Sequence, residues 1–217
     1  MHFEVLVEDP SGKSALDIFM PKVIGRGDTY RVISYRGIGH VPRDLKGSTD
    51  PKKRLLLNQL PRLLRGYGRT FRSYPEHYRA SVIVVCDLDE RCLKEFRREL
   101  NVILEACQPS PVTRFCFAVE EGEAWLLGDL SAVVAAYPRG DATVLRRYRQ
   151  DAICGTWELL ADAVHHGGAT ALKGAGWQAI GREKATWAAH IAPYVDVERN
   201  ASPSFRYFRK QVRTLAQ

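Results

Sequence analysis

The sequence SVIVVCDLDE at residues 81–90 decides the fold class of this chain. Residues 82–85 are apolar at every position, which is typical of a strand buried on both faces of a parallel sheet. Residues 93–107 follow with apolar side chains at helical spacing, so they predict an amphipathic helix. A buried strand followed at once by a helix is the repeating unit of an α/β protein.

The flanking sequence repeats this alternation of strand and helix. Runs of β-branched and aromatic residues predict further strands near residues 3–7, 30–35 and 112–119. Helical spacing predicts helices near residues 11–20, 51–64 and 123–130. Ser11 or Ser14 is a candidate N-cap for the first of these helices, and Pro61 is expected to kink or end part of the second. We therefore predict an α/β fold with a mainly parallel sheet flanked by helices.

Strand patterns fade from about residue 130 onward. Helical spacing is found over residues 144–164, 183–195 and 204–215, around a Gly-rich segment at 167–176 that we expect to be a loop. We predict an α/β domain over residues 1–130 and a helical extension over residues 131–217 that packs on it.

Composition excludes several classes of protein. The chain has five cysteines, an odd number without a CxxC pair, which argues against a zinc cage or a disulfide framework. Its first residues have neither a basic segment nor a long apolar segment of a signal peptide. No stretch approaches the roughly 20 apolar residues of a membrane helix. We expect a cytoplasmic protein with no membrane partner.

Positive charge is concentrated in one part of the chain. Between Arg43 and Arg79 lie ten basic and three acidic residues, which accounts for the whole net charge of +7. Aromatic residues at 67, 71, 74 and 78 are interleaved with these arginines. Arginines can follow phosphates while aromatic rings stack on bases, so this stretch predicts a nucleic-acid surface. The candidate contacts are Arg65, Arg69, Arg72 and Arg79. The alternative is a solvated helix face whose aromatic residues belong to the core.

Acidic residues stand where the predicted strands end. Glu8 follows the first strand, Asp87 and Asp89 follow the strongest one, and acidic residues at 120, 121 and 123 follow the last. The carboxyl ends of parallel strands lie at one edge of a sheet, where ligands collect. Clustered carboxylates there suit Mg²⁺. The alternatives are an Asp87-x-x-Glu90 capping box, a solvated Glu8 and an acidic first helical turn at residues 120–123.

Four segments together resemble a known family. They are VE at 7–8, VVCDLD at 84–89, EGEAWLLGD at 121–129 and SPSF at 202–205. A strand ending in Glu and a later strand ending in Asp-x-Asp resemble the Toprim pattern of topoisomerases, primases and overcoming-lysogenization-defect nucleases. The four segments together resemble the DUF4276 proteins, a small bacterial Toprim-like family.

The resemblance implies a Toprim fold with an Mg²⁺ or Mn²⁺ site. Glu8, Asp87 and Asp89 would be both metal ligands and catalytic residues, and Glu123 would help to hold the metal. Asp129 also matches the family, but six helical steps from Glu123 turn it about 240° away, so we do not expect both to bind one ion. Asp9 stands where the family usually has glycine. Relatives in mobile-element defence are often linked to ATPases, which implies an ATPase partner.

These observations predict a metal-dependent nuclease or a related phosphodiester-processing enzyme, with DNA and RNA both open as substrates. In this enzyme Glu8 is alternatively a general acid or base. Two other possibilities stay open: a non-catalytic nucleic-acid-binding or regulatory subunit of an ATPase complex, and a site for a small phosphorylated ligand. The segment GKS at 12–14 does not complete a phosphate-binding loop, because Val7 stands where that motif requires glycine.

Overall fold

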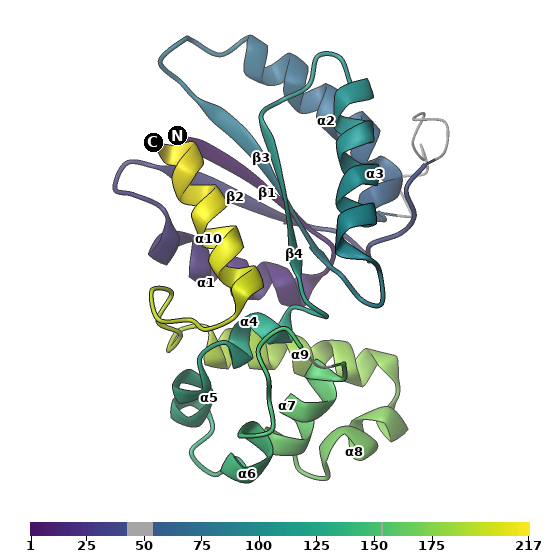
Figure 1. The fold of residues 1–217 in the computed structure, drawn as a ribbon, viewed down its shortest axis with the longest axis vertical. Coiled ribbons are helices and arrows are strands. Elements are labelled where there is room, and N and C mark those ends of the chain that lie inside the picture. Colours follow the sequence, from purple (N-terminus) through teal and green to yellow (C-terminus); the bar gives the residue numbers. More distant parts are fainter. Residues whose placement is uncertain (43–53, 153) are drawn as a thin grey trace.

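The computed structural model describes residues 1–42, 54–152 and 154–217 (Figure 1). Within them, one parallel sheet is formed by β1 (His2–Val7), β2 (Thr29–Ser34), β3 (Ala80–Asp87) and β4 (Thr113–Ala118). The strand order is β2-β1-β3-β4. The predicted α/β class and parallel sheet are confirmed. The chain adds β2 on one side of β1 and β3 on the other, so the strand order reverses between β1 and β3.

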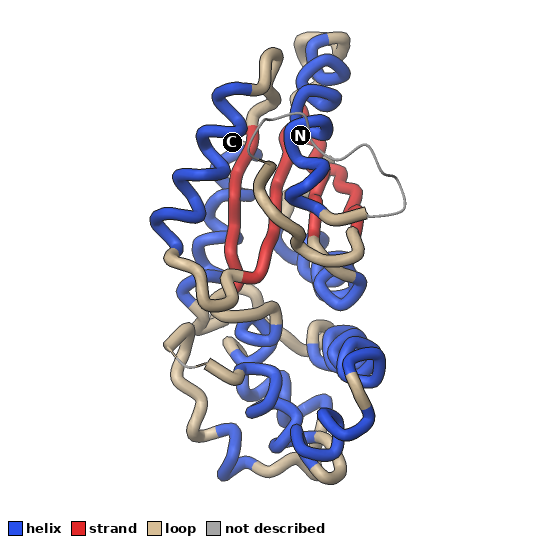
Figure 2. Tube along the Cα trace, turned by 90° about the vertical axis from the view of Figure 1, so that its right-hand side faces the viewer, coloured by secondary structure: helices blue, strands red, loops and turns tan. Residues whose placement is uncertain are grey.

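Helices cover both faces of the sheet (Figures 1 and 2). One face packs against α2 (Leu56–Arg72) and α3 (Leu93–Ala106), and the other against α1 (Pro10–Val23) and α10 (Pro203–Ala216). The apolar run of β3 supplies both cores: Val82 and Val84 face the α2–α3 side, while Ile83 and Val85 face the α1–α10 side. This two-sided burial explains why the run contains no polar residue.

Two details of the helices differ from the prediction. Asp9, rather than Ser11 or Ser14, caps α1: its carboxylate accepts the Gly12 N–H at 2.7 Å. Asp9 stands directly before a proline at the first helical position, where an extended cap residue is favoured. Pro61 does not end α2, of which it is the sixth residue. Proline has no backbone N–H, so the helix lacks one backbone hydrogen bond at this position but continues to Arg72.

The remaining helices gather beyond the carboxyl ends of the strands (Figure 1). They are α4 (Glu123–Leu127), α5 (Leu130–Ala136), α6 (Ala142–Leu145), α7 (Thr156–Val164), α8 (Gly168–Ala175) and α9 (Trp177–Ile191). The helix predicted over residues 144–164 is therefore divided into α6 and α7. The prediction of a loop at 167–176 is wrong. This segment forms α8, and its residues Ala169 and Leu172 are buried in the core.

The sheet and the helical region share one apolar cluster. It joins buried residues of β1 and β3 to residues of α7, α9 and α10. The chain also returns from the helical region to the sheet, where α10 packs beside β4. The predicted division at residue 130 stays a prediction. No described helix is both long and apolar enough to cross a lipid bilayer.

Candidate acidic site at the carboxyl edge of the sheet

An acidic site lies at the point where the strand order reverses. Glu8 directly follows β1, and Asp87 is the last residue of the adjacent strand β3. The parallel register pairs Val7 with Val85, which brings the two acidic residues to the same edge. The Asp87 N–H donates to Glu8 Oε2 at 3.2 Å. In open α/β sheets this reversal point opens the crevice where ligands bind.

The helical region adds two more acidic residues and a cation to this site. Glu123 is the first residue of α4, and its side chain is only 3% exposed. Lys184 reaches in from α9, with its Nζ 3.0 Å from Glu123 Oε2 and 3.4 Å from Glu121 Oε2. Lys184, whose side chain is 15% exposed, thus borders the site from α9, and the sequence did not indicate it.

Burial dominates the electrostatics of these groups. It raises the pKa of Glu8 to about 8, although the hydrogen bond from the Asp87 backbone offsets part of this rise. Burial and the neighbouring Glu8 raise the pKa of Asp87 well above its usual value. Burial also raises the pKa of Glu121 to about 7.

The lysine responds in the opposite sense. Burial lowers the pKa of Lys184, but the carboxylates of Glu123, Asp87 and Glu121 outweigh burial and leave that pKa above its usual value. One ammonium group therefore stands among several crowded acidic groups. The surplus acidic groups can keep protons or attract a further cation.

A small cavity opens between the sheet and α9. Its volume is about 30 Å³, and Glu8, Asp87, Glu123 and Ala188 contribute to its lining. A cavity needs roughly 10–15 Å³ to hold one water molecule, so this one has room for a water molecule or a small cation.

The donor atoms match Mg²⁺ in chemistry, but they are not assembled as ligands. Glu121 Oε2 and Glu123 Oε2 are buried, and the one polar partner that each has among the described residues is Lys184 Nζ, at 3.4 and 3.0 Å. Carboxylate oxygens are the protein donors that Mg²⁺ prefers. Yet no group of three His, Cys, Asp or Glu residues in the described chain is placed to hold a metal ion. Metal binding here therefore requires the side chains to move from the arrangement observed.

Asp89 lies at the rim of the site rather than in its cavity. Its side chain is 47% exposed and lies 3.5 Å from the guanidinium of Arg91. Its backbone has a φ of +50°, and its N–H donates to the Glu120 carbonyl at 2.9 Å. Aspartate tolerates this left-handed conformation better than most residues. Asp89 is close enough for its charge to raise the pKa of Glu8.

Helix capping does not account for Asp87. The helix α3 begins after Cys92, and no side chain caps its first turn. The capping box suggested by Asp87-x-x-Glu90 is therefore wrong.

Other acidic residues near the site do have structural roles. Glu120 accepts the N–H and hydroxyl of Thr156 at 3.1 and 2.9 Å, which holds the start of α7. Asp129 caps α5 and accepts the Asp196 N–H at 2.9 Å, so it is engaged away from Glu123. The extra carboxylate of Asp9 caps α1, as described above.

The most distinctive segments of the sequence bind each other. The indole N–H of Trp125 donates to Ser204 Oγ at 3.0 Å, and the Asn200 side-chain amide donates to the Trp125 carbonyl at 2.8 Å. Asp151 accepts the Ser202 hydroxyl at 2.9 Å and the Ser204 N–H at 2.6 Å. This buried network joins α4, which carries Glu123, to the start of α10. Its contribution to the site is positional.

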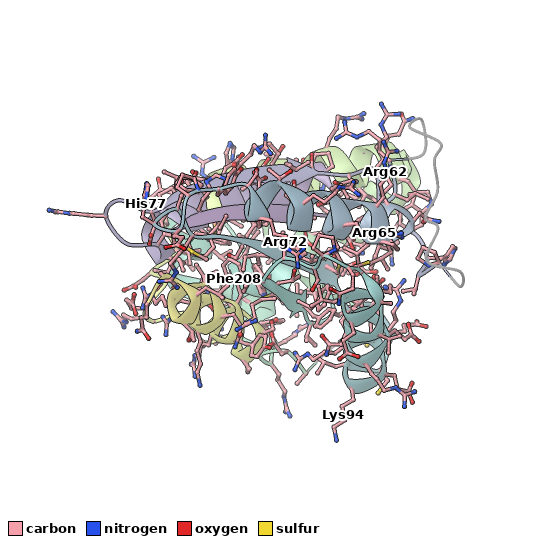
Figure 3. The ribbon with its side chains drawn as sticks, turned by 90° about the horizontal axis from the view of Figure 1, so that it is seen from above. Arg62, Arg65, Arg72, His77, Lys94 and Phe208 are labelled. Carbon is pink, nitrogen blue, oxygen red and sulfur yellow. The ribbon has the colours of Figure 1, made fainter. Side chains whose placement is uncertain are left out.

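Basic residues recur along α2, where Figure 3 labels Arg62, Arg65 and Arg72, and no residue of α2 lines the cavity. Arg62, Arg69 and Arg72 are exposed, whereas Arg65 is partly buried and donates to the Pro61 carbonyl at 3.1 Å. Arg79 donates to the Leu215 carbonyl at 2.8 Å. The basic residues of the same stretch at 43, 46, 52 and 53 lie outside the described residues.

The interleaved aromatic residues pack mainly on one another. Ring centroids are 5.5 Å apart for Tyr67 and Phe71, 5.6 Å for Phe71 and Tyr74, and 4.9 Å for Tyr74 and Tyr78. Only Tyr78, at 44%, is among the exposed large hydrophobic residues. This arrangement favours arginine contacts with phosphates over extensive base stacking on α2.

Comparison with known proteins adds no identification. No protein-family model, no curated protein and no solved structure matches this chain significantly.

Proposed function

We propose that this protein is an Mg²⁺- or Mn²⁺-dependent nuclease of the Toprim-like kind that the DUF4276 resemblance implies. The observation that carries the proposal is the meeting of Glu8, Asp87 and Glu123 at the reversal point of the sheet. These residues come from separate elements and surround one small cavity.

Each residue of the site has a role in this proposal. Glu8, Asp87 and Glu123 would hold the metal, and Asp89 at the rim would be a further ligand. A bound divalent ion supplies charge stabilisation for the phosphate and an activated water molecule. Alternatively, Glu8 does not bind the metal and acts as general acid or base, a role that suits its raised pKa of about 8 in the metal-free protein.

Nucleic acid would be held by the arginines of α2. Exposed guanidinium groups at Arg62, Arg69 and Arg72 can pair with successive phosphates without reading the base sequence. An ATPase partner in mobile-element defence belongs to the proposal through the family resemblance.

The test is metal-dependent cleavage by the purified chain. Labelled single-stranded and duplex DNA and RNA are incubated with Mg²⁺, Mn²⁺ or EDTA, with Asp87→Asn as the matched inactive variant. We expect cleavage that requires metal and is lost in the variant. If no substrate is cut with either metal, alone or with a co-purified ATPase, the nuclease proposal is wrong.

One observation favours a second candidate, a non-catalytic regulatory subunit of an ATPase complex. Lys184 already forms ion pairs with both Glu121 and Glu123, so these two acidic residues have a cation partner without a metal. A purely structural cluster would not respond to Mg²⁺, whereas a metal site gains thermal stability from the ion by mass action. Thermal melting with and without Mg²⁺ therefore separates the two candidates before any substrate is known.

A further inference from the structure

We infer that Trp177 is a stacking platform for an unpaired base of the nucleic acid entering the acidic site, and that the substrate is therefore single-stranded there. This inference rests on the proposed nuclease function and names its substrate class. Trp177 is the first residue of α9, the helix that also carries Lys184.

The position of Trp177 follows from helix geometry. In a helix with 3.6 residues per turn, positions 177, 181, 184 and 188 fall on one stripe. Lys184 forms the ion pairs of the acidic site, and Ala188 lines its cavity. The stripe that begins at Trp177 therefore leads directly into the site. In Figure 1, α9 runs just beyond the carboxyl ends of the strands.

Exposure along this stripe falls steadily toward the site. Trp177 is 83% exposed, the Lys184 side chain is 15% exposed, and Ala188 is 3% exposed. Between Trp177 and Lys184 on this stripe, Gly181 has open space where a side chain would stand. The ring thus stands exposed at the outer end of the stripe that leads to Lys184.

The apolar faces of the Trp177 indole are therefore in contact with solvent rather than with other side chains. The other three tryptophans, Trp125, Trp157 and Trp187, are buried in the core. Every nucleic-acid base has a π-face, so an exposed aromatic ring beside a phosphate site is suited to stacking without sequence preference.

The spacing also fits a nucleotide strand. Seven residues of helix rise about 10 Å, the distance along the axis from Trp177 to Lys184. Phosphates of one stacked strand are about 3.4 Å apart along the axis, so the stacked base would lie up to about three nucleotides from the phosphate in the site. In a duplex both faces of a base are already stacked, so the platform selects unpaired nucleotides.

Fluorescence gives a direct readout of this contact. Because the other tryptophans are buried, Trp177 is the one that a bound base can reach and quench. The probe is a DNA single strand with phosphorothioate linkages, which resists cleavage, and the comparison is the same strand annealed to its full complement, a blunt-ended duplex without unpaired bases. We expect quenching by the single strand and little by the duplex.

Variants then assign the contact. Trp177→Ala should bind the single strand roughly tenfold more weakly, equivalent to 1.4 kcal/mol. Trp177→Phe should restore most of the affinity while lacking the quenching. Tyr194→Ala removes an exposed aromatic beyond the end of α9 and serves as the matched control with unchanged binding.

Three results would overturn the inference. They are equal single-strand affinity of Trp177→Ala and the parent protein, equal quenching by the duplex, and a change of oligomeric state in Trp177→Ala, which would make the indole a contact between copies. Failure of the nuclease proposal gives a different result. In that case the parent protein itself shows neither an Mg²⁺-dependent thermal shift nor cleavage.

Discussion

Replacing Glu8 by glutamine should stabilise the metal-free protein at neutral and alkaline pH. Glu8 is held in a buried position where its charged form is disfavoured, and its pKa rises from 4.5 to about 8. The folded protein therefore keeps a proton that the unfolded chain has already lost. This contribution to stability is complete below about pH 4.5 and is lost as pH rises through about 8. Glutamine has the same shape and never ionises.

The size of the effect follows from the shift. A rise from 4.5 to about 8 is roughly 3.5 pKa units, and each unit corresponds to 1.36 kcal/mol, so the upper limit is about 5 kcal/mol. The charge of Glu8 raises the pKa of Asp87, and the charges of Asp9 and Asp89 raise that of Glu8, so part of this energy is shared with neighbouring carboxylates. In a protein of this length 1 kcal/mol moves the melting temperature by about 2–4 °C. We expect a difference on the order of 10 °C between the two proteins at pH 8.5.

The assay is thermal melting in EDTA from pH 5 to pH 9. The parent protein should lose stability across this range more steeply than Glu8→Gln. Glu4→Gln is the matched control, because Glu4 is another buried glutamate on the same strand segment. It accepts two hydrogen bonds from Arg31, at 2.9 and 2.8 Å, so its removal should destabilise the protein.

Two outcomes would refute the reasoning. One is a lower melting temperature for Glu8→Gln than for the parent protein at pH 8.5. The other is an identical pH slope in the two proteins, which would mean that Glu8 ionises as easily in the folded chain as in water.

Four further predictions concern the site, the arginines of α2 and the partner. Asp87→Asn and Asp89→Asn should each abolish metal-dependent cleavage while the metal-free melting temperature stays unchanged or rises; a lower melting temperature in both, with an equal Mg²⁺ shift, would exclude a metal role. Lys184→Met should lower metal-free stability by about 3–5 kcal/mol and increase the Mg²⁺-induced thermal shift, because it removes the competing cation; an unchanged shift would show that the lysine and the metal do not compete. Replacing Arg65, Arg69 and Arg72 by glutamate should weaken nucleic-acid binding whatever the base sequence and flatten the salt dependence of that binding, both measured by fluorescence anisotropy. Affinity purification from the native host should recover an ATPase, and repeated recovery of the chain alone would count against this partner.

The fold class and the positions of Glu8 and Asp87 at the sheet edge could be predicted because they depend on short stretches of sequence. A four-residue apolar run predicts a strand buried on both faces, and the residue after such a strand must lie at the edge of the sheet. Asp87 could therefore be placed from its neighbours alone, and Glu8 likewise. The parallel register then brings both residues together.

Residues that depend on packing between distant elements could not be placed in this way. Lys184 reaches the site only because α9 packs against α1, and no local pattern distinguishes it from the other lysines of the chain. The role of Glu120 likewise depends on the start of α7, 36 residues away. Asp9 could have been recognised as a cap, since it precedes a proline at a predicted helix start.

The contrast among the acidic residues is the strongest support for a bound cation. Asp9, Glu120 and Asp129 each accept hydrogen bonds that hold a helix end, and buried Glu4 is paired with Arg31. In these four cases the chain itself stabilises the carboxylate. Three glutamates of the acidic site have less support from the chain: Glu8 accepts a backbone N–H at 3.2 Å, and the buried Oε2 atoms of Glu121 and Glu123 share one lysine. A fold that satisfies its structural acids but leaves a cluster under-neutralised at its ligand-binding edge favours an ion supplied from outside.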